Sequence, residues 1–123
     1  MHPAVSDEAA TETALAPERA AELIAADAEL IDVRRPYEWD GGRIPGSRNI
    51  EVNELPAAAE SISKDRVVIF YCRAGNRSAM AAEAFRQAGF DAHSLAGGIE
   101  AWAAAGQPLE PDGGEVRKPL PAS

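Results

Sequence analysis

The sequence predicts an α/β fold built on a parallel sheet. Segments with strand character alternate along the chain with segments of helical periodicity, which is the pattern of βαβ units. The central segment Val67–Tyr71 is apolar without alternation, as expected for a strand that is covered on both faces. The length of 123 residues is enough for one domain with a single core.

The first half of the chain is predicted to hold a helix, a strand and a long loop. Residues 17–28 have apolar side chains at helical spacing, and Pro17 suits the first position of a helix. Residues 29–33 read as a short strand, after which Pro36 has no N–H to donate and stops regular structure. We therefore expect a loop over residues 35–47, with turns at its Gly-Gly and Pro-Gly pairs.

The second half is predicted to continue the alternation around the central strand. The expected elements are a short strand over 48–50, a loosely amphipathic helix over 51–62 that Pro56 interrupts, a helix over 78–88, a strand over 90–95 and a short helix after Gly97 that holds Trp102. We expect the ordered domain to span residues 15–108. The polar, acidic residues 1–14 and the proline-rich residues 109–123 are predicted to be flexible tails.

Composition and charge restrict the classes of partner. The net charge of −8 argues against nucleic acid, which needs basic surface, and the chain has no apolar run of about 18 residues to enter a membrane. Between residues 34 and 86 the chain has nine Lys and Arg residues and seven Asp and Glu residues. The rest of the chain has three Lys and Arg residues and thirteen Asp and Glu residues. This local excess indicates either an anion site or arginines scattered over the surface. One cysteine and no signal peptide favour a reducing compartment, and we expect the cytoplasm.

The only cysteine, Cys72, lies between the central strand and the next helix. The carboxyl end of a strand in a parallel sheet is where ligands bind. The positive start of a helix and the nearby Arg73 and Arg77 favour a thiolate, which is the attacking form of cysteine. The loop can also direct several N–H groups inward as a nest for an anion. The alternative is a small buried apolar side chain, the usual role of an unpaired cysteine, but the surrounding residues favour a nucleophile.

These segments together resemble the single-domain rhodanese family, the thiosulfate or persulfide sulfurtransferases. The resemblance covers residues 15–108 and depends on four motifs that occur in order. The motifs are residues 30–34 (LIDVR) with 37–39 (YEW), residues 44–50 (IPGSRNI), residues 68–78 (VIFYCRAGNRS) and residues 95–99 (LAGGI) with Trp102.

The resemblance implies a rhodanese-like, five-stranded parallel sheet flanked by helices on both faces, and a double-displacement reaction. Cys72 is then the catalytic nucleophile, which takes a sulfur from a small anionic donor such as thiosulfate and passes it to a thiol, a protein or cyanide. Asp32 and Arg34 match positions that we interpret as structural. The resemblance also implies that the substrate binds to the loop residues Arg73, Ala74, Gly75, Asn76 and Arg77.

Two other functions remain open at this stage. One is a non-catalytic rhodanese-like module that binds a partner, although such modules often lack the cysteine. The other is a phosphatase or arsenate reductase of the related fold, whose signature places five residues between Cys and Arg. Four residues separate Cys72 from Arg77, and the shorter loop suits a single sulfur atom. Without a cluster of Cys and His, neither a metal nor another cofactor is expected.

Overall fold

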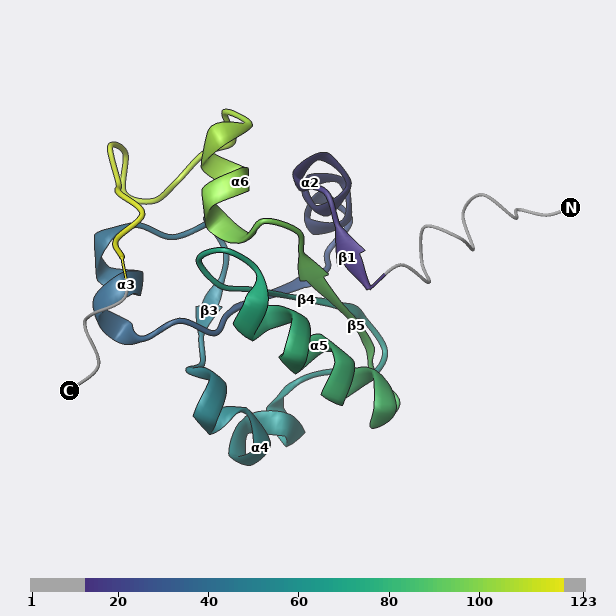
Figure 1. The fold of residues 1–123 in the computed structure, drawn as a ribbon. Helices are drawn as coiled ribbons and strands as arrows, with labels where there is room; N and C mark the ends of the chain where they lie inside the picture. The colour runs from purple at the N-terminus through teal and green to yellow at the C-terminus, as the bar shows by residue number, and fades with distance from the viewer. Residues whose placement is uncertain (1–12, 119–123) are drawn as a thin grey trace, which may run out of the picture.

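The computed structural model describes residues 13–118, which form a parallel sheet with helices on both faces (Figure 1). The strand order is β1-β5-β4-β2-β3, so β4, which precedes the cysteine, is the central strand. All pairs of neighbouring strands are parallel, which confirms the expected architecture. The strands are β1 (Ala14–Leu15), β2 (Glu29–Asp32), β3 (Arg48–Asn49), β4 (Val67–Tyr71) and β5 (Asp91–Leu95).

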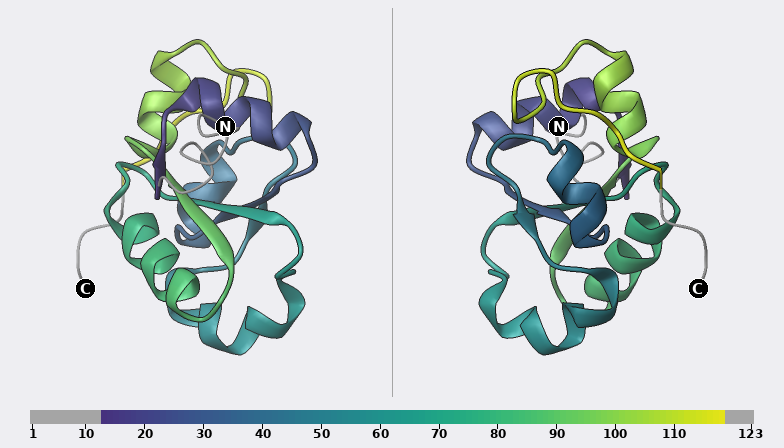
Figure 2. Two further views of the ribbon diagram at one scale, coloured as in Figure 1. Left: turned by 90° about the vertical axis from the view of Figure 1, so that its right-hand side faces the viewer. Right: turned by 90° about the vertical axis from the view of Figure 1, so that its left-hand side faces the viewer.

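The helices form two layers, one on each side of the sheet (Figure 2). One layer holds α2 (Pro17–Ala25) and α6 (Gly98–Ala104), and the other holds α4 (Leu55–Ala58) and α5 (Asn76–Gln87). Side chains of β4 alternate between two apolar cores. Val68 and Phe70 pack under α5, whereas Ile69 and Tyr71 pack toward α2 and α6. The absence of alternation in the sequence of β4 therefore reflects burial on both faces.

The loop predicted over residues 35–47 is wrong in its first part, because Pro36–Gly41 forms a helix, α3. Pro36 occupies the first helical position, where no N–H is needed and its fixed φ suits the helix. The Arg35 N–H donates to Glu38 Oε1 at 3.2 Å, which satisfies a group at the start of this short helix. The predicted helix over 51–62 is also broken, into 3₁₀ turns at Val52–Glu54 and Ala59–Ser61 on either side of α4.

The end of the described chain lies on the domain, although residues 109–123 were expected to be a flexible tail. Glu110 and Arg43 exchange two backbone hydrogen bonds of 2.9 and 2.7 Å, and the Glu115 N–H donates to the Gly41 carbonyl. Residues 109–118 thereby hold the segment that follows α3. The rest of that predicted tail, and residues 1–12 of the predicted N-terminal tail, lie outside the described residues, so their flexibility stays a prediction.

Candidate active site

Cys72 lies at the carboxyl end of β4, and the loop after it curls around the sulfur. Gly75 has a φ of +111°, a conformation that side chains rarely adopt, and this turns the chain into α5. The N–H groups of Gly75 and Ser78 donate to Cys72 Sγ over 3.1 and 3.4 Å. Two backbone donors thus converge on one sulfur, and they stabilise negative charge there.

Two buried hydroxyl groups lie beneath the sulfur. Ser78 Oγ is 3.5 Å from Cys72 Sγ and 2.8 Å from Ser94 Oγ, which belongs to β5. Ser78 is in the first turn of α5, so its side chain and its N–H reach the same atom. Because a hydroxyl hydrogen rotates, Ser78 accepts from a thiol and donates to a thiolate.

The first turn of α6 holds the loop from the other side. The N–H groups of Ile99 and Glu100 donate to the carbonyls of Cys72 and Arg73 over 2.9 and 3.1 Å. A Cβ at Gly98 would collide with those two carbonyl groups, so only glycine permits this approach. Both carbonyls are engaged on the side of α6, which leaves the inner side of the loop to N–H groups.

The two arginines of the loop both pair with carboxylates. Arg77 makes two hydrogen bonds of 3.1 Å to the buried Glu38 of α3, and Arg73 Nη2 lies 2.7 Å from Glu100 Oε2. The hydrogen bonds and charge of Glu38 hold the pKa of Arg77 above its usual value. Each arginine therefore brings a negative partner, and the backbone N–H groups are the donors closest to the sulfur.

Asp32 and Arg34 form a fully buried pair below the loop, in agreement with the structural roles expected for them. Their shortest contact, Nη2 to Oδ2, is 2.6 Å, and Nη2 also donates to the Gly42 carbonyl. Arg34 lies over the ring of Tyr71, whose hydroxyl accepts the Ile44 N–H at 3.0 Å. These contacts join β2, β4 and the loop after α3.

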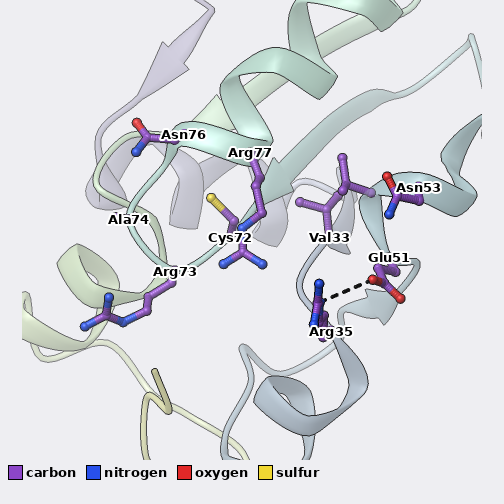
Figure 3. A pocket seen from close by; sticks show the side chains of 10 residues that line it. Val33, Arg35, Glu51, Asn53, Cys72, Arg73, Ala74, Asn76 and Arg77 are labelled. Carbon is purple, nitrogen blue, oxygen red and sulfur yellow. Dashed lines mark ion pairs between the residues drawn. The ribbon is translucent and has the colours of Figure 1, made fainter. Parts of the chain in front are cut away.

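An open cleft of about 480 Å³ lies above Cys72 (Figure 3). Figure 3 shows Ala74 and Arg73 on one side, Arg35 and Glu51 on the other, and Cys72 with Arg77 between them. Cys72 itself is only 1% exposed, so its sulfur lies at the floor of the cleft. The lining residues are Val33, Arg35, Glu51, Val52, Asn53, Cys72, Arg73, Ala74, Asn76 and Arg77.

The structure brings together all of the site residues that the sequence suggested. Five of the six line the cleft, and the sixth, Gly75, contacts Sγ through its N–H. Sequence reasoning missed the Ser78 hydroxyl, the Glu38 partner of Arg77 and the opposite wall at Arg35 and Glu51. That wall follows the carboxyl ends of β2 and β3, and the rule that parallel strands end at one edge could have indicated it.

Within residues 13–118, His, Cys, Asp and Glu side chains form no group of three or more that could hold a metal ion. None of the helices in this part of the chain is long and apolar enough to cross a bilayer.

A family model for the Rhodanese-like domain matches residues 16–105. The chain belongs to this family. The match includes every strand except β1, together with the whole loop from Cys72 to Ser78. This confirms the relationship that the four sequence motifs indicated.

Named relatives include sulfurtransferases. The chain is 37% identical over 89 residues to the thiosulfate sulfurtransferase GlpE of Pseudomonas aeruginosa. The aligned region covers 72% of this chain and 81% of GlpE. The chain is 41% identical over 76 residues to the uncharacterized protein YqhL of Bacillus subtilis, covering 61% of this chain. The aligned region spans 60% of YqhL and 21% of the longer MoeZ of Mycobacterium tuberculosis. The chain therefore matches only part of the length of these two relatives.

Solved structures show the same fold. A rhodanese-related protein from Thermoplasma volcanium superposes with a TM-score of 0.74 and 33% identity, over 78% of this chain and 95% of that chain. A Rhodopseudomonas palustris protein, described as a "Possible Tyrosine Phosphatase", superposes with a TM-score of 0.72 and 33% identity, over 85% and 89% of the two chains.

Proposed function

We propose that this rhodanese is a sulfurtransferase that carries the transferred sulfur as a persulfide on Cys72. The observation that carries the proposal is the position of Sγ, which lies at the floor of a cleft and accepts the N–H groups of Gly75 and Ser78. Donors in this arrangement stabilise a thiolate before the reaction and a persulfide after it. The sulfurtransferase named among the relatives supports the same chemistry.

In the first half-reaction the Cys72 thiolate attacks the outer sulfur of thiosulfate. A new S–S bond forms to Cys72, and the bond between the two sulfur atoms of thiosulfate breaks. The electron pair of that bond leaves with sulfite, so the reaction needs no external oxidant or reductant. The N–H groups of the loop, from Arg73 to Arg77, then surround the added sulfur and its negative charge. Arg73 and Arg77 add positive potential, which their carboxylate partners weaken.

In the second half-reaction an acceptor thiolate, a protein thiol or cyanide attacks the outer sulfur of the persulfide. The S–S bond to Cys72 breaks, its electron pair returns to Cys72, and the thiolate is restored. Because Cys72 is 1% exposed, the acceptor reacts with a sulfur that projects into the cleft. This geometry favours acceptors that can enter the cleft with a small reactive group.

The direct test is the mass of the protein after treatment with thiosulfate. We expect the wild-type protein to gain one sulfur atom and to lose it again when cyanide is added. Cys72→Ser should show no gain, and Ala79→Ser, on the exposed face of α5, should load as the wild type does. An unmodified wild-type protein, with thiosulfate and organic persulfides alike, would instead favour a non-catalytic module that binds a partner.

A phosphatase activity is the second candidate, because a structural relative has that description. The loop argues against it, since four residues between Cys72 and Arg77 make a tighter nest than the five of the phosphatase signature. Hydrolysis of an aryl phosphate that depends on Cys72 would overturn the sulfurtransferase proposal. We expect none above the Cys72→Ser background.

We propose that the partners of this protein are small anionic sulfur donors and thiol acceptors. We also propose that it binds neither nucleic acid nor a membrane, because its net charge is −8. The catalytic step described above uses no metal or other cofactor. A reducing compartment such as the cytoplasm suits the chain, because its one cysteine must stay free to accept sulfur.

A further inference from the structure

The cleft is larger than its simplest substrate requires. A volume of about 480 Å³ falls in the range of sites that enclose an organic ligand, whereas thiosulfate is a small dianion. Val33, Arg35 and Glu51 line the side of the cleft opposite Arg73 and Ala74 of the cysteine loop (Figure 3). The size indicates a donor with a body attached to its reactive sulfur.

The charges of the cleft differ in how firmly they are paired. Arg73 and Arg77 make contacts of 2.7 and 3.1 Å to their carboxylates, within hydrogen-bonding distance. Arg35 Nε and Glu51 Oε2 are 3.7 Å apart, which is too far for a hydrogen bond. The Arg35 side chain is 56% exposed and that of Glu51 is 27% exposed, so both can contact a ligand.

A ligand with charge of only one sign is poorly matched to such a pair. A dianion that binds Arg35 separates it from Glu51 and brings a second negative charge near that carboxylate. A ligand with both a carboxylate and an ammonium can bind Arg35 with the first and Glu51 with the second. Both protein charges then remain paired, and the like-charge contact is avoided.

We propose that Arg35 and Glu51 determine donor specificity, and that they select a low-molecular-weight organic persulfide that carries both a carboxylate and an ammonium group. This inference rests on the proposed sulfurtransferase function. The Cys72 thiolate attacks the outer sulfur of the persulfide and forms a new S–S bond. The original S–S bond of the donor breaks, and its electron pair leaves on the donor's thiolate. Total charge and oxidation state are conserved in this exchange.

The test compares three persulfides that share one reactive group. Cysteine persulfide carries both charges, N-acetylcysteine persulfide lacks the ammonium and cysteamine persulfide lacks the carboxylate. We expect the wild-type kcat/KM for cysteine persulfide to be at least about five times that for either analogue. The difference should come mainly from a lower KM for cysteine persulfide. Glu51→Gln should abolish the preference over the N-acetyl donor, and Arg35→Gln the preference over cysteamine persulfide. With thiosulfate, Glu51→Gln should raise kcat/KM, because a repelling charge is removed.

The control is Glu54→Gln, which removes an exposed carboxylate three residues away that does not line the cleft. It should keep the wild-type preference for all three persulfides. Equal kcat/KM for the three donors in the wild type, or an unchanged preference in Glu51→Gln, would overturn the inference. In that case Cys72 would still gain sulfur, whereas failure of the proposed function would leave Cys72 unmodified by every donor.

Discussion

Arg77 of the cysteine loop and Glu38 of α3 form a bidentate pair, with both N–O distances at 3.1 Å. Glu38 is 1% exposed, whereas Arg77 is 31% exposed and lines the cleft. Glu38 also accepts the Arg35 N–H, so one carboxylate connects the loop to the start of α3. The position of the loop arginine therefore depends on a helix that lies 39 residues earlier in the chain.

Glu38→Gln should weaken this connection and lower the free energy of unfolding by about 1–3 kcal/mol, because a buried charge-assisted interaction is lost. Urea denaturation measures the change. Because Arg77 is then no longer held in position beside the cysteine, sulfur loading should also be slower, as measured by mass spectrometry. Glu54→Gln, at an exposed position, is the control and should change neither quantity. Wild-type stability in Glu38→Gln would show that the pair contributes nothing to the fold.

Ser78→Ala should slow alkylation of Cys72 by iodoacetamide about tenfold at neutral pH. The variant removes the hydroxyl that lies 3.5 Å from Sγ, and a hydrogen bond to a charged group contributes on this scale. Ser94→Ala removes only one of the hydrogen-bond partners of the Ser78 hydroxyl and should have a smaller effect. If Ser78→Ala reacts at the wild-type rate, the thiolate depends on the backbone N–H groups alone.

Gly98→Ala should be much more damaging than Gly106→Ala, although both glycines have positive φ values, +62° and +81°. A methyl group at Gly98 collides with the carbonyls of Cys72 and Arg73, whereas nothing lies within 4 Å of one at Gly106. Gly106→Ala should cost about 1 kcal/mol from backbone strain alone. Gly98→Ala should cost more and should also slow sulfur loading, as measured by urea denaturation and mass spectrometry. Equal costs would mean that the loop moves without penalty.

Tyr71 should make the protein less stable at alkaline pH. Burial, together with the charge of Asp32, raises the pKa of Tyr71 well above its ordinary value of about 10. Above that value the unfolded chain releases the proton while the folded chain retains it, so the free energy of unfolding falls as pH rises. Urea denaturation between pH 9 and 11 should show a shallower decline in Tyr71→Phe. Tyr37→Phe, at an exposed position, should keep the wild-type slope.

The central part of the molecule could be predicted because local signals and the tertiary structure agree there. Residues 67–71 are apolar throughout, and the strand is buried on both faces. After Cys72 the chain turns into α5 at Gly75, and the positive φ of this turn is one that glycine adopts readily. The segment over 36–41 was mispredicted because proline stops a helix in its interior but favours its first position, and sequence alone left both readings available.

The opposite wall of the cleft could not be assigned from local patterns. Arg35 and Glu51 are ordinary charged residues in the sequence, and their meeting depends on β2 and β3 ending side by side. Glu38 was similarly unassigned, because its role comes from Arg77, a residue distant in sequence. The two-residue strand β1 is too short to show any periodicity, and it is defined by its pairing with β5.

The burial of Cys72 limits which molecules can react with its sulfur. A sulfur atom bonded to Sγ would stand about 2 Å further from the floor of the cleft, the length of an S–S bond. The cargo would then be reachable while the cysteine that holds it stays covered. Protein disulfides and disulfides of bulky thiols, which must reach the thiolate directly for exchange, would be excluded by shape. The same depth that presents the sulfur would therefore protect its carrier from unwanted cross-links.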